Sequence, residues 1–133
     1  MQVDLIVRGI CGMRPGVPGV SETIRVVSVV GRLLEHERIM QFGDELWIGS
    51  ADWLPRNLDR RVETIVPILD EGLRQQLITI LDQTWEDHRQ AWSLRPDGSW
   101  LRPSEDEGTP SQERFMRAAH AEAAAAAAAA EGA

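Results

Sequence analysis

The 133-residue sequence predicts an α/β (α+β) fold: a mixed sheet, a packed amphipathic helix and a C-terminal Ala-rich helical tail. Short apolar and β-branched runs, separated by turn residues, predict the strands. One stripe of apolar residues at helical spacing predicts the packed helix. With 43% hydrophobic residues, the chain can fill one small core.

The first half alternates strand-like runs with loops. Val3–Arg8 is apolar and predicts a strand buried on both faces. Gly9–Gly19 holds four glycines and two prolines in eleven residues, which predicts a loop with special backbone angles and exposed N–H groups. Ile24–Val30 predicts a second strand.

A hairpin is expected next, over residues 38–50. Gly43 and Asp44 separate two apolar runs and are typical of a tight turn. We expect Ser50–Arg61 to be a polar stretch and Val62–Ile68 to be a short strand.

The second half begins with the amphipathic helix. Asp70 is the predicted N-cap. The stripe that should face the core is Leu73, Leu77, Ile80, Leu81 and Trp85. Two apolar runs around Arg95-Pro96-Asp97-Gly98 predict another hairpin.

The last 31 residues differ in composition. Pro103–Gly108 reads as an acidic linker, and Thr109–Gln112 has the pattern of a capping box with Pro at the first helical position. Eleven of the thirteen residues in Ala118–Ala130 are alanine. We expect one domain over 1–102 and a mobile linker and helical tail over 103–133.

Composition narrows the function. The net charge of −7 argues against non-specific nucleic-acid binding. The excess of acid lies after residue 62, because residues 1–62 hold eight acidic residues and eight arginines. There is no lysine, so an anion site must use arginine, histidine or backbone N–H groups. The single cysteine, Cys11, and the absence of a signal or membrane segment predict a cytoplasmic protein.

His36 and Arg38 are the strongest candidates for chemistry. They are two residues apart at the start of a strand, so both side chains can point to one face. The open end of the predicted hairpin would bring them near the Gly49–Asp52 turn. A guanidinium, an imidazole, a hydroxyl and backbone N–H groups together suit a phosphoryl oxygen. Arg8 would join this group if its strand lies beside the hairpin.

Other interpretations of these residues remain open. A histidine between two glutamates is often solvated, and Gly-Ser marks many turns. Arg56, Arg60 and Arg61 could pair with nearby acids at the surface, which contributes about 0–1 kcal/mol per pair.

Several stretches, in order and with their spacing, resemble the carboxy-terminal domain of type 1 polyphosphate kinase over about residues 2–102. They are Val3–Cys11, Arg14-Pro15-Gly16, Leu34-Glu35-His36, Gly49–Trp53 and Arg56–Glu63. This resemblance implies a phospholipase D-like half domain, in which Arg38 stands where a phospholipase has lysine. Possible supporting residues of the site are Arg38, Ser50, Asp52, Arg56 and Asn57.

The family transfers the terminal phosphate of ATP, with Mg²⁺, to a growing polyphosphate chain through a phosphohistidine. By resemblance, Arg8 matches an arginine that contacts the nucleotide phosphates. His36 matches a second histidine that assists transfer as a proton donor or phosphate ligand. The expected partners are ATP or ADP and polyphosphate, with a homo-oligomeric full-length enzyme, no nucleic acid and no membrane span.

The family's phosphorylated histidine and nucleotide-stacking tyrosine lie in preceding domains, and this chain has no tyrosine. We therefore expect a C-terminal fragment that is inactive alone, with most Mg²⁺ ligands outside the chain and no metal ligands assigned within it. One alternative is a phospholipase D-like phosphodiesterase that dimerises to bring two His36 side chains together. Another is a non-catalytic module that binds polyphosphate or nucleotide through Arg8, Arg14 and loop N–H groups.

Overall fold

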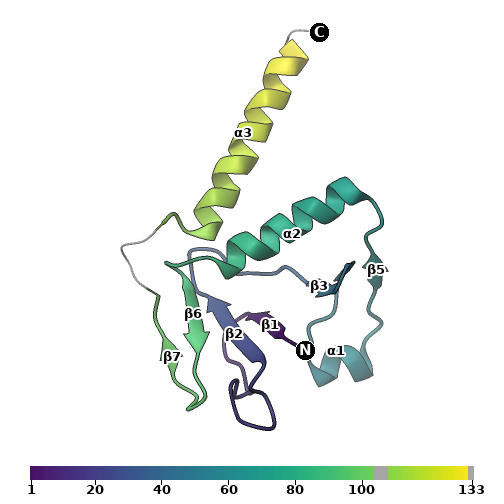
Figure 1. Ribbon diagram of the computed structural model, residues 1–133. Helices are drawn as coiled ribbons and strands as arrows, with labels where there is room; N and C mark the ends of the chain where they lie inside the picture. The colour runs from purple at the N-terminus through teal and green to yellow at the C-terminus, as the bar shows by residue number, and fades with distance from the viewer. Residues whose placement is uncertain (104–107, 132–133) are drawn as a thin grey trace. The chain divides into compact units, whose positions relative to one another are not determined.

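The computed structural model describes residues 1–103 and 108–131 of the chain (Figure 1). The chain divides into two compact units, each with its own sheet. The first unit comprises Met1–Glu35 and Thr84–Ala133, and the second comprises His36–Gln83. Within the described residues, no helix combines the length and the apolar character needed to cross a membrane.

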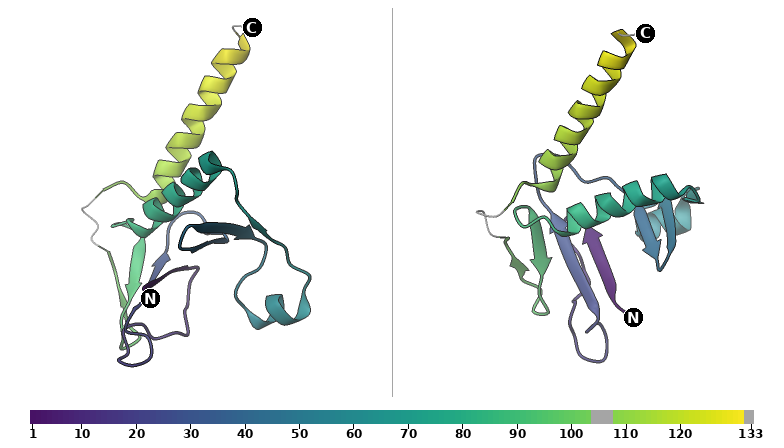
Figure 2. Two further views of the ribbon diagram at one scale, coloured as in Figure 1. Left: turned by 45° about the vertical axis from the view of Figure 1, so that its right-hand side comes forward. Right: turned by 45° about the horizontal axis from the view of Figure 1, so that its top comes forward.

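The sheet of the first unit has the strand order β1-β2-β6-β7, and Figure 2 shows β2 between β1 and β6. β1 is parallel to β2, whereas the β2–β6 and β6–β7 pairs are antiparallel, which confirms the expected mixed sheet. The strands are β1 Val3–Val7, β2 Ile24–Val29, β6 Ala91–Leu94 and β7 Trp100–Leu101.

The expectation that the first strand is buried on both faces is wrong. Asp4 is exposed, and its carboxylate accepts two hydrogen bonds from Arg25 on β2, at 2.7 and 2.6 Å. β2 is the buried strand instead, with Val26–Val29 all buried. The difference in burial follows from the positions of the two strands in the sheet. β2 pairs with a strand on each side, whereas β1 pairs, among the described residues, with β2 alone.

The connection between β1 and β2 is a loop, although most parallel pairs use a helix. Its glycines at 9, 16 and 19 have positive φ, which confirms the special backbone angles. Ser21 is buried and ties the loop together. Its hydroxyl donates to the Arg14 carbonyl at 2.5 Å and accepts from the Val17 N–H at 3.2 Å.

The second unit confirms the hairpin predicted over residues 38–50. β3 (Ile39–Phe42) and β4 (Glu45–Gly49) are antiparallel. Gly43 has φ +60° in the turn between them, a conformation that glycine adopts without strain. β5 is shorter than expected, at Ile65–Pro67, and pairs with β4.

A short helix, α1 (Pro55–Arg60), lies within the stretch expected to be irregular. Its N-cap position is Leu54, whose side chain makes no capping hydrogen bond. Pro55 at the first turn is the only local start signal. Because the usual Ser, Thr, Asp or Asn cap is missing, the sequence pattern did not indicate this helix.

α2 (Glu71–Trp85) confirms the amphipathic helix and its cap, because Asp70 Oδ1 accepts a hydrogen bond from the Leu73 N–H at 2.9 Å. Four members of the predicted stripe are partly buried, whereas the first, Leu73, is 51% exposed. The last of them, Trp85, packs against Val27 and Val29 in the core of the first unit.

Asp87 follows α2 and is almost completely buried. Its Oδ1 accepts hydrogen bonds from the N–H groups of Arg89 and Gln90, at 2.9 and 2.8 Å. Its Oδ2 accepts from both the N–H and the hydroxyl of Ser111, at 2.6 and 2.7 Å. Burial raises the pKa of Asp87, but the Ser111 groups and the two other amides outweigh it and lower the pKa below 3.8.

The terminal helix, α3, spans Ser111–Glu131 and leaves the sheet at its first turn (Figures 1 and 2). Gln112, the expected last member of a capping box, instead bonds to the main chain of Leu33. The hairpin around residues 95–98 is confirmed by the β6–β7 pair. Residues 104–107 of the expected linker lie outside the described residues. The domain division at 103 and the mobility of the tail stay predictions.

We predict that Asp87→Asn lowers the free energy of unfolding at neutral pH by about 1–3 kcal/mol, because four donors lose a charged acceptor. Urea denaturation measures this loss. The folded pKa of Asp87 lies below 3.8, so its stabilisation is present above that pH and disappears as pH falls through the folded pKa. The difference in the free energy of unfolding between the parent and Asp87→Asn should therefore become smaller only below about pH 4. Equal free energies of unfolding of the two proteins at pH 7 would contradict a stabilising role of the Asp87 carboxylate.

Candidate phosphate site

His36 and Arg38 lie side by side at the start of the β3–β4 hairpin. Arg38 Nη1 is 3.2 Å from His36 Nδ1, and Arg38 Nη2 is 3.2 Å from His36 Nε2. Arg38 Nη1 also donates to the His36 carbonyl at 3.2 Å. The guanidinium thus contacts both the ring and the backbone of this exposed histidine, which fixes the direction of the ring.

The contact is compatible with either neutral tautomer of His36. A guanidinium has only donors, and a neutral imidazole has one acceptor nitrogen. At most one of the two ring contacts is therefore a hydrogen bond from Arg38. When Arg38 donates a hydrogen bond to one ring nitrogen, the other ring nitrogen carries the proton. That N–H can then donate a hydrogen bond to a ligand oxygen.

Arg38 is itself held by Asp52. Asp52 Oδ1 accepts from Arg38 Nε at 3.1 Å and lies 3.0 Å from Nη2, and both side chains are only about one-fifth exposed. The Gly49 N–H donates to the Arg38 carbonyl at 3.0 Å and continues the ladder of the hairpin. The open end of the hairpin thus gathers an imidazole, a guanidinium and a carboxylate.

Ser50 and Asn57 meet at Glu63 rather than at His36. The Ser50 hydroxyl donates to Glu63 Oε2 at 2.5 Å, and the Asn57 amide donates to Oε1 at 2.8 Å. Ser50 Oγ also accepts from the Thr64 N–H at 3.1 Å. Asn57 is buried, so this bond fixes α1 against the segment that enters β5.

Glu63 is the member of this network that sequence reasoning did not place in the site. The Ser50 hydroxyl, followed by the Asn57 amide, lowers the pKa of Glu63 below 4.5, and burial opposes them. Glu63 bonds to Ser50 and Asn57, and Asp52 bonds to Arg38. Arg56 is exposed. The sequence signal for this network was the occurrence of Ser50, Asn57 and Glu63 within fourteen residues.

Arg8 belongs to the first unit. It follows the last residue of β1, and its Nη1 lies 3.4 Å from the carbonyl oxygen of Glu35. The next N–H, of Gly9, donates to the Ser28 hydroxyl at 3.1 Å. Because His36 belongs to the second unit, the joint action of Arg8 and His36 on one phosphate stays a prediction.

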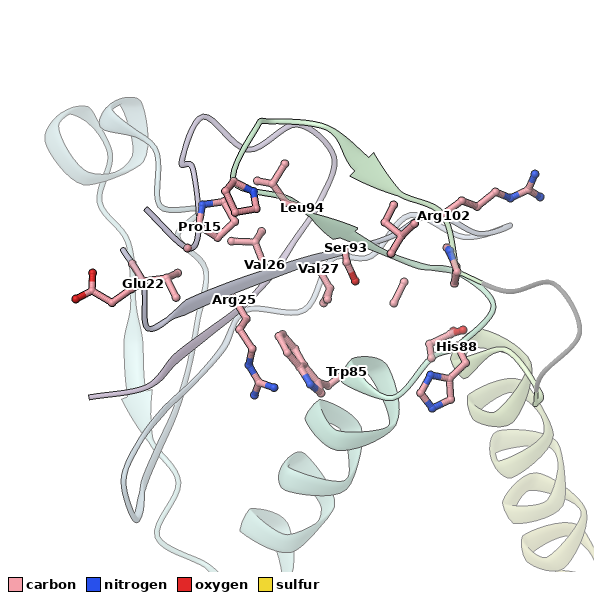
Figure 3. Close-up of a pocket in the computed structure, with 17 residues that line it drawn as sticks. Pro15, Glu22, Arg25, Val26, Val27, Trp85, His88, Ser93, Leu94 and Arg102 are labelled. Atoms are coloured by element: carbon pink, nitrogen blue, oxygen red, sulfur yellow. The ribbon is translucent and has the colours of Figure 1, made fainter. Parts of the chain in front are cut away.

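A cleft of about 600 Å³ lies in the first unit, and its lining includes none of the residues predicted for the site (Figure 3). Val26, Val27 and Leu94 give it an apolar lining. The Arg25 guanidinium covers one side of it, 4.8 Å from the centre of the Trp85 ring.

Among the residues that the structure describes, no three His, Cys, Asp or Glu side chains are grouped so that they could hold a metal ion. Asp52 and Glu63 already bond to Arg38, Ser50 and Asn57. These two described carboxylates are thus engaged by protein donors.

The hairpin brings His36, Arg38 and Asp52 together on an α+β fold. Comparison with known proteins assigns the chain to a family. The family model of the polyphosphate kinase C-terminal domain 2 matches residues 1–114. The chain belongs to this family.

Individual relatives agree. The chain is 52% identical over 124 residues to a polyphosphate kinase of Synechocystis, covering 89% of this chain and 17% of that protein. It is 55% identical over 104 residues to a polyphosphate kinase of Thermosynechococcus vestitus, covering 75% and 14%. A crystal structure of polyphosphate kinase from Porphyromonas gingivalis superposes with a TM-score of 0.78 at 37% identity, covering 91% and 19%. The chain thus spans less than one-fifth of the length of these relatives, and the expected fold class is confirmed.

We predict that Ser50→Ala raises the pKa of Glu63 toward 4.5, because it removes the strongest hydrogen bond to the carboxylate. Carbon-detected NMR titration of the Glu63 carboxyl measures the change. The folded pKa is depressed, so the ionised carboxylate stabilises the second unit above about pH 4.5, and this contribution is lost as pH falls through the folded pKa. Ser93→Ala, in the other unit, is the matched control and should leave the titration unchanged. An unchanged Glu63 midpoint in Ser50→Ala would exclude the proposed bond.

Proposed function

We propose that this chain supplies one part of a polyphosphate kinase active site, in which His36 and Arg8 contact the phosphoryl group that is transferred. The observation that carries the proposal is the Arg38 guanidinium lying 3.2 Å from each nitrogen of the His36 ring, so that it can donate to either one. A held ring can present one N–H to a phosphoryl oxygen in a fixed direction.

Physical chemistry supports this role. Catalysis of phosphoryl transfer depends mainly on positioning and on compensation of charge at the phosphoryl oxygens. Arg8 supplies a permanent cation. Asp52 fixes Arg38, so His36 does not have to be ordered at the moment of reaction. Ser50, Asn57 and Glu63 support the same turn and the neighbouring helix.

The remaining parts of the reaction belong to the same proposal. The terminal phosphoryl of ATP would pass to a nucleophilic histidine, and from it to the end of a polyphosphate chain. This histidine and most Mg²⁺ ligands would lie in other domains of the enzyme, which is cytoplasmic and homo-oligomeric. The chain alone should therefore not extend polyphosphate.

The alternatives identified from the sequence predict different activities. A phosphodiesterase that dimerises through His36 would hydrolyse a chromogenic phosphodiester. A binding module would bind tripolyphosphate but add nothing to a kinase. The relatives, all named polyphosphate kinases, favour the first proposal over both.

A chimera tests the proposal. In the Synechocystis polyphosphate kinase, residues 1–114 of this chain replace the matching segment. We expect the chimera to make polyphosphate from ATP with Mg²⁺, and His36→Ala to lower its rate by about 10²–10⁴-fold, the usual effect of removing a proton-transfer group. Arg8→Ala should weaken ATP binding.

His88→Ala removes a histidine from the cleft of the first unit and serves as the matched control. It should leave the rate of the chimera nearly unchanged. A folded but inactive chimera, full activity in His36→Ala, or rapid polyphosphate synthesis by the isolated chain would each contradict the proposal.

A further inference from the structure

Gln112, in the first turn of α3, binds a segment 79 residues away in the sequence. Its Oε1 accepts from the Leu33 N–H at 2.9 Å, and its Nε2 donates to the Leu33 carbonyl at 2.7 Å. The side-chain amide thus pairs with both main-chain groups of one residue, as a neighbouring strand would. Nε2 also donates to Glu35 Oε1 at 2.6 Å.

The Gln112 side chain is buried, and the main chain around it leaves little free space. A Cβ added at Gly31 would lie 2.5 Å from Gln112 Oε1 and 2.6 Å from Gln90 Oε1. Real Cβ contacts are not this short, so a side chain at residue 31 would displace the glutamine. The backbone of Ser111, the preceding residue, is fixed by the buried Asp87 carboxylate.

The segment that Gln112 holds leads directly into the phosphate site. Glu35 receives one bond from Gln112 on its carboxylate, and its carbonyl lies 3.4 Å from Arg8 Nη1. His36 is the next residue in the chain. One buried amide therefore fixes a short segment that touches Arg8 and is bonded covalently to His36.

From these contacts we propose that Gln112 is a positioning residue for the phosphate site, a role that rests on the proposed function of Arg8 and His36. It acts through the backbone of Leu33–Glu35 and has no contact with substrate. The first turn of α3 thereby belongs to the site, although the pattern of its sequence indicates only a helix start.

The test uses the full chain and two variants of the same helix turn. Gln112→Glu keeps the acceptor for the Leu33 N–H, but it loses both Nε2 bonds and places a second carboxylate against Glu35. Ser111→Ala is the matched control, because it loses the hydroxyl bond to Asp87 and leaves Gln112 and the Ser111 N–H in place. Gly31→Ala displaces the amide by crowding instead of by charge.

Two measurements are made on each protein: NMR spectra of the Glu35 and His36 amides and the His36 ring without ligand, and calorimetric binding of tripolyphosphate. We expect Gln112→Glu and Gly31→Ala to shift the His36 signals and to weaken tripolyphosphate binding by about tenfold, equivalent to one or two lost hydrogen bonds. Ser111→Ala should lower stability but leave the spectra of residues 35–36 and the affinity close to those of the parent.

Unchanged His36 signals in Gln112→Glu, or equal effects in Gln112→Glu and Ser111→Ala, would overturn the positioning role. If the parent binds no tripolyphosphate, the proposed function of the site fails in this chain. The ligand-free spectra still decide whether Gln112 sets the geometry of His36.

Discussion

The buried carboxylate of Asp87 is the interaction on which the first unit depends. It ties together the turn between α2 and β6, in which it lies, and joins this turn to the first residue of α3, 24 residues later. A buried carboxylate is costly unless several donors satisfy it, and here four do so. Because Ser111 is fixed, the following Gln112 reaches the segment before His36. One acidic side chain thus fixes the helix turn that holds the Leu33–Glu35 segment.

In the second unit, too, the carboxylates at the site are satisfied by hydrogen-bond donors. Its site contains two carboxylates, yet neither is left to repel a phosphate as a free charge. Asp52 is paired with Arg38, and Glu63 accepts hydrogen bonds from Ser50 and Asn57. Asp52 therefore orders Arg38 beside His36, and Glu63 orders Ser50 and Asn57 in the neighbouring turn. With these carboxylates engaged by protein donors, a net charge of −7 does not argue against the anion site proposed at His36.

The sequence predicted the parts of this structure that depend on neighbouring residues. The Gly43-Asp44 turn gave the correct hairpin, and Asp70 gave the correct helix start. The failures involve partners far away in the chain. Gln112 was assigned to a capping box because its partner lies 79 residues earlier, and the burial of β1 depends on which strands flank it. The candidates His36 and Arg38 came from their spacing, whereas the position of Glu63 required the folded turn.

The central claim is that Arg8 and His36 contact the same phosphate. NMR titration of the full chain with tripolyphosphate, followed at the Arg8 guanidinium and the His36 ring, tests it most directly. The account predicts that both signals shift with a single dissociation constant, and that Arg8→Ala weakens the response of His36. Two different dissociation constants, or a His36 response that Arg8→Ala leaves unchanged, would contradict a shared site.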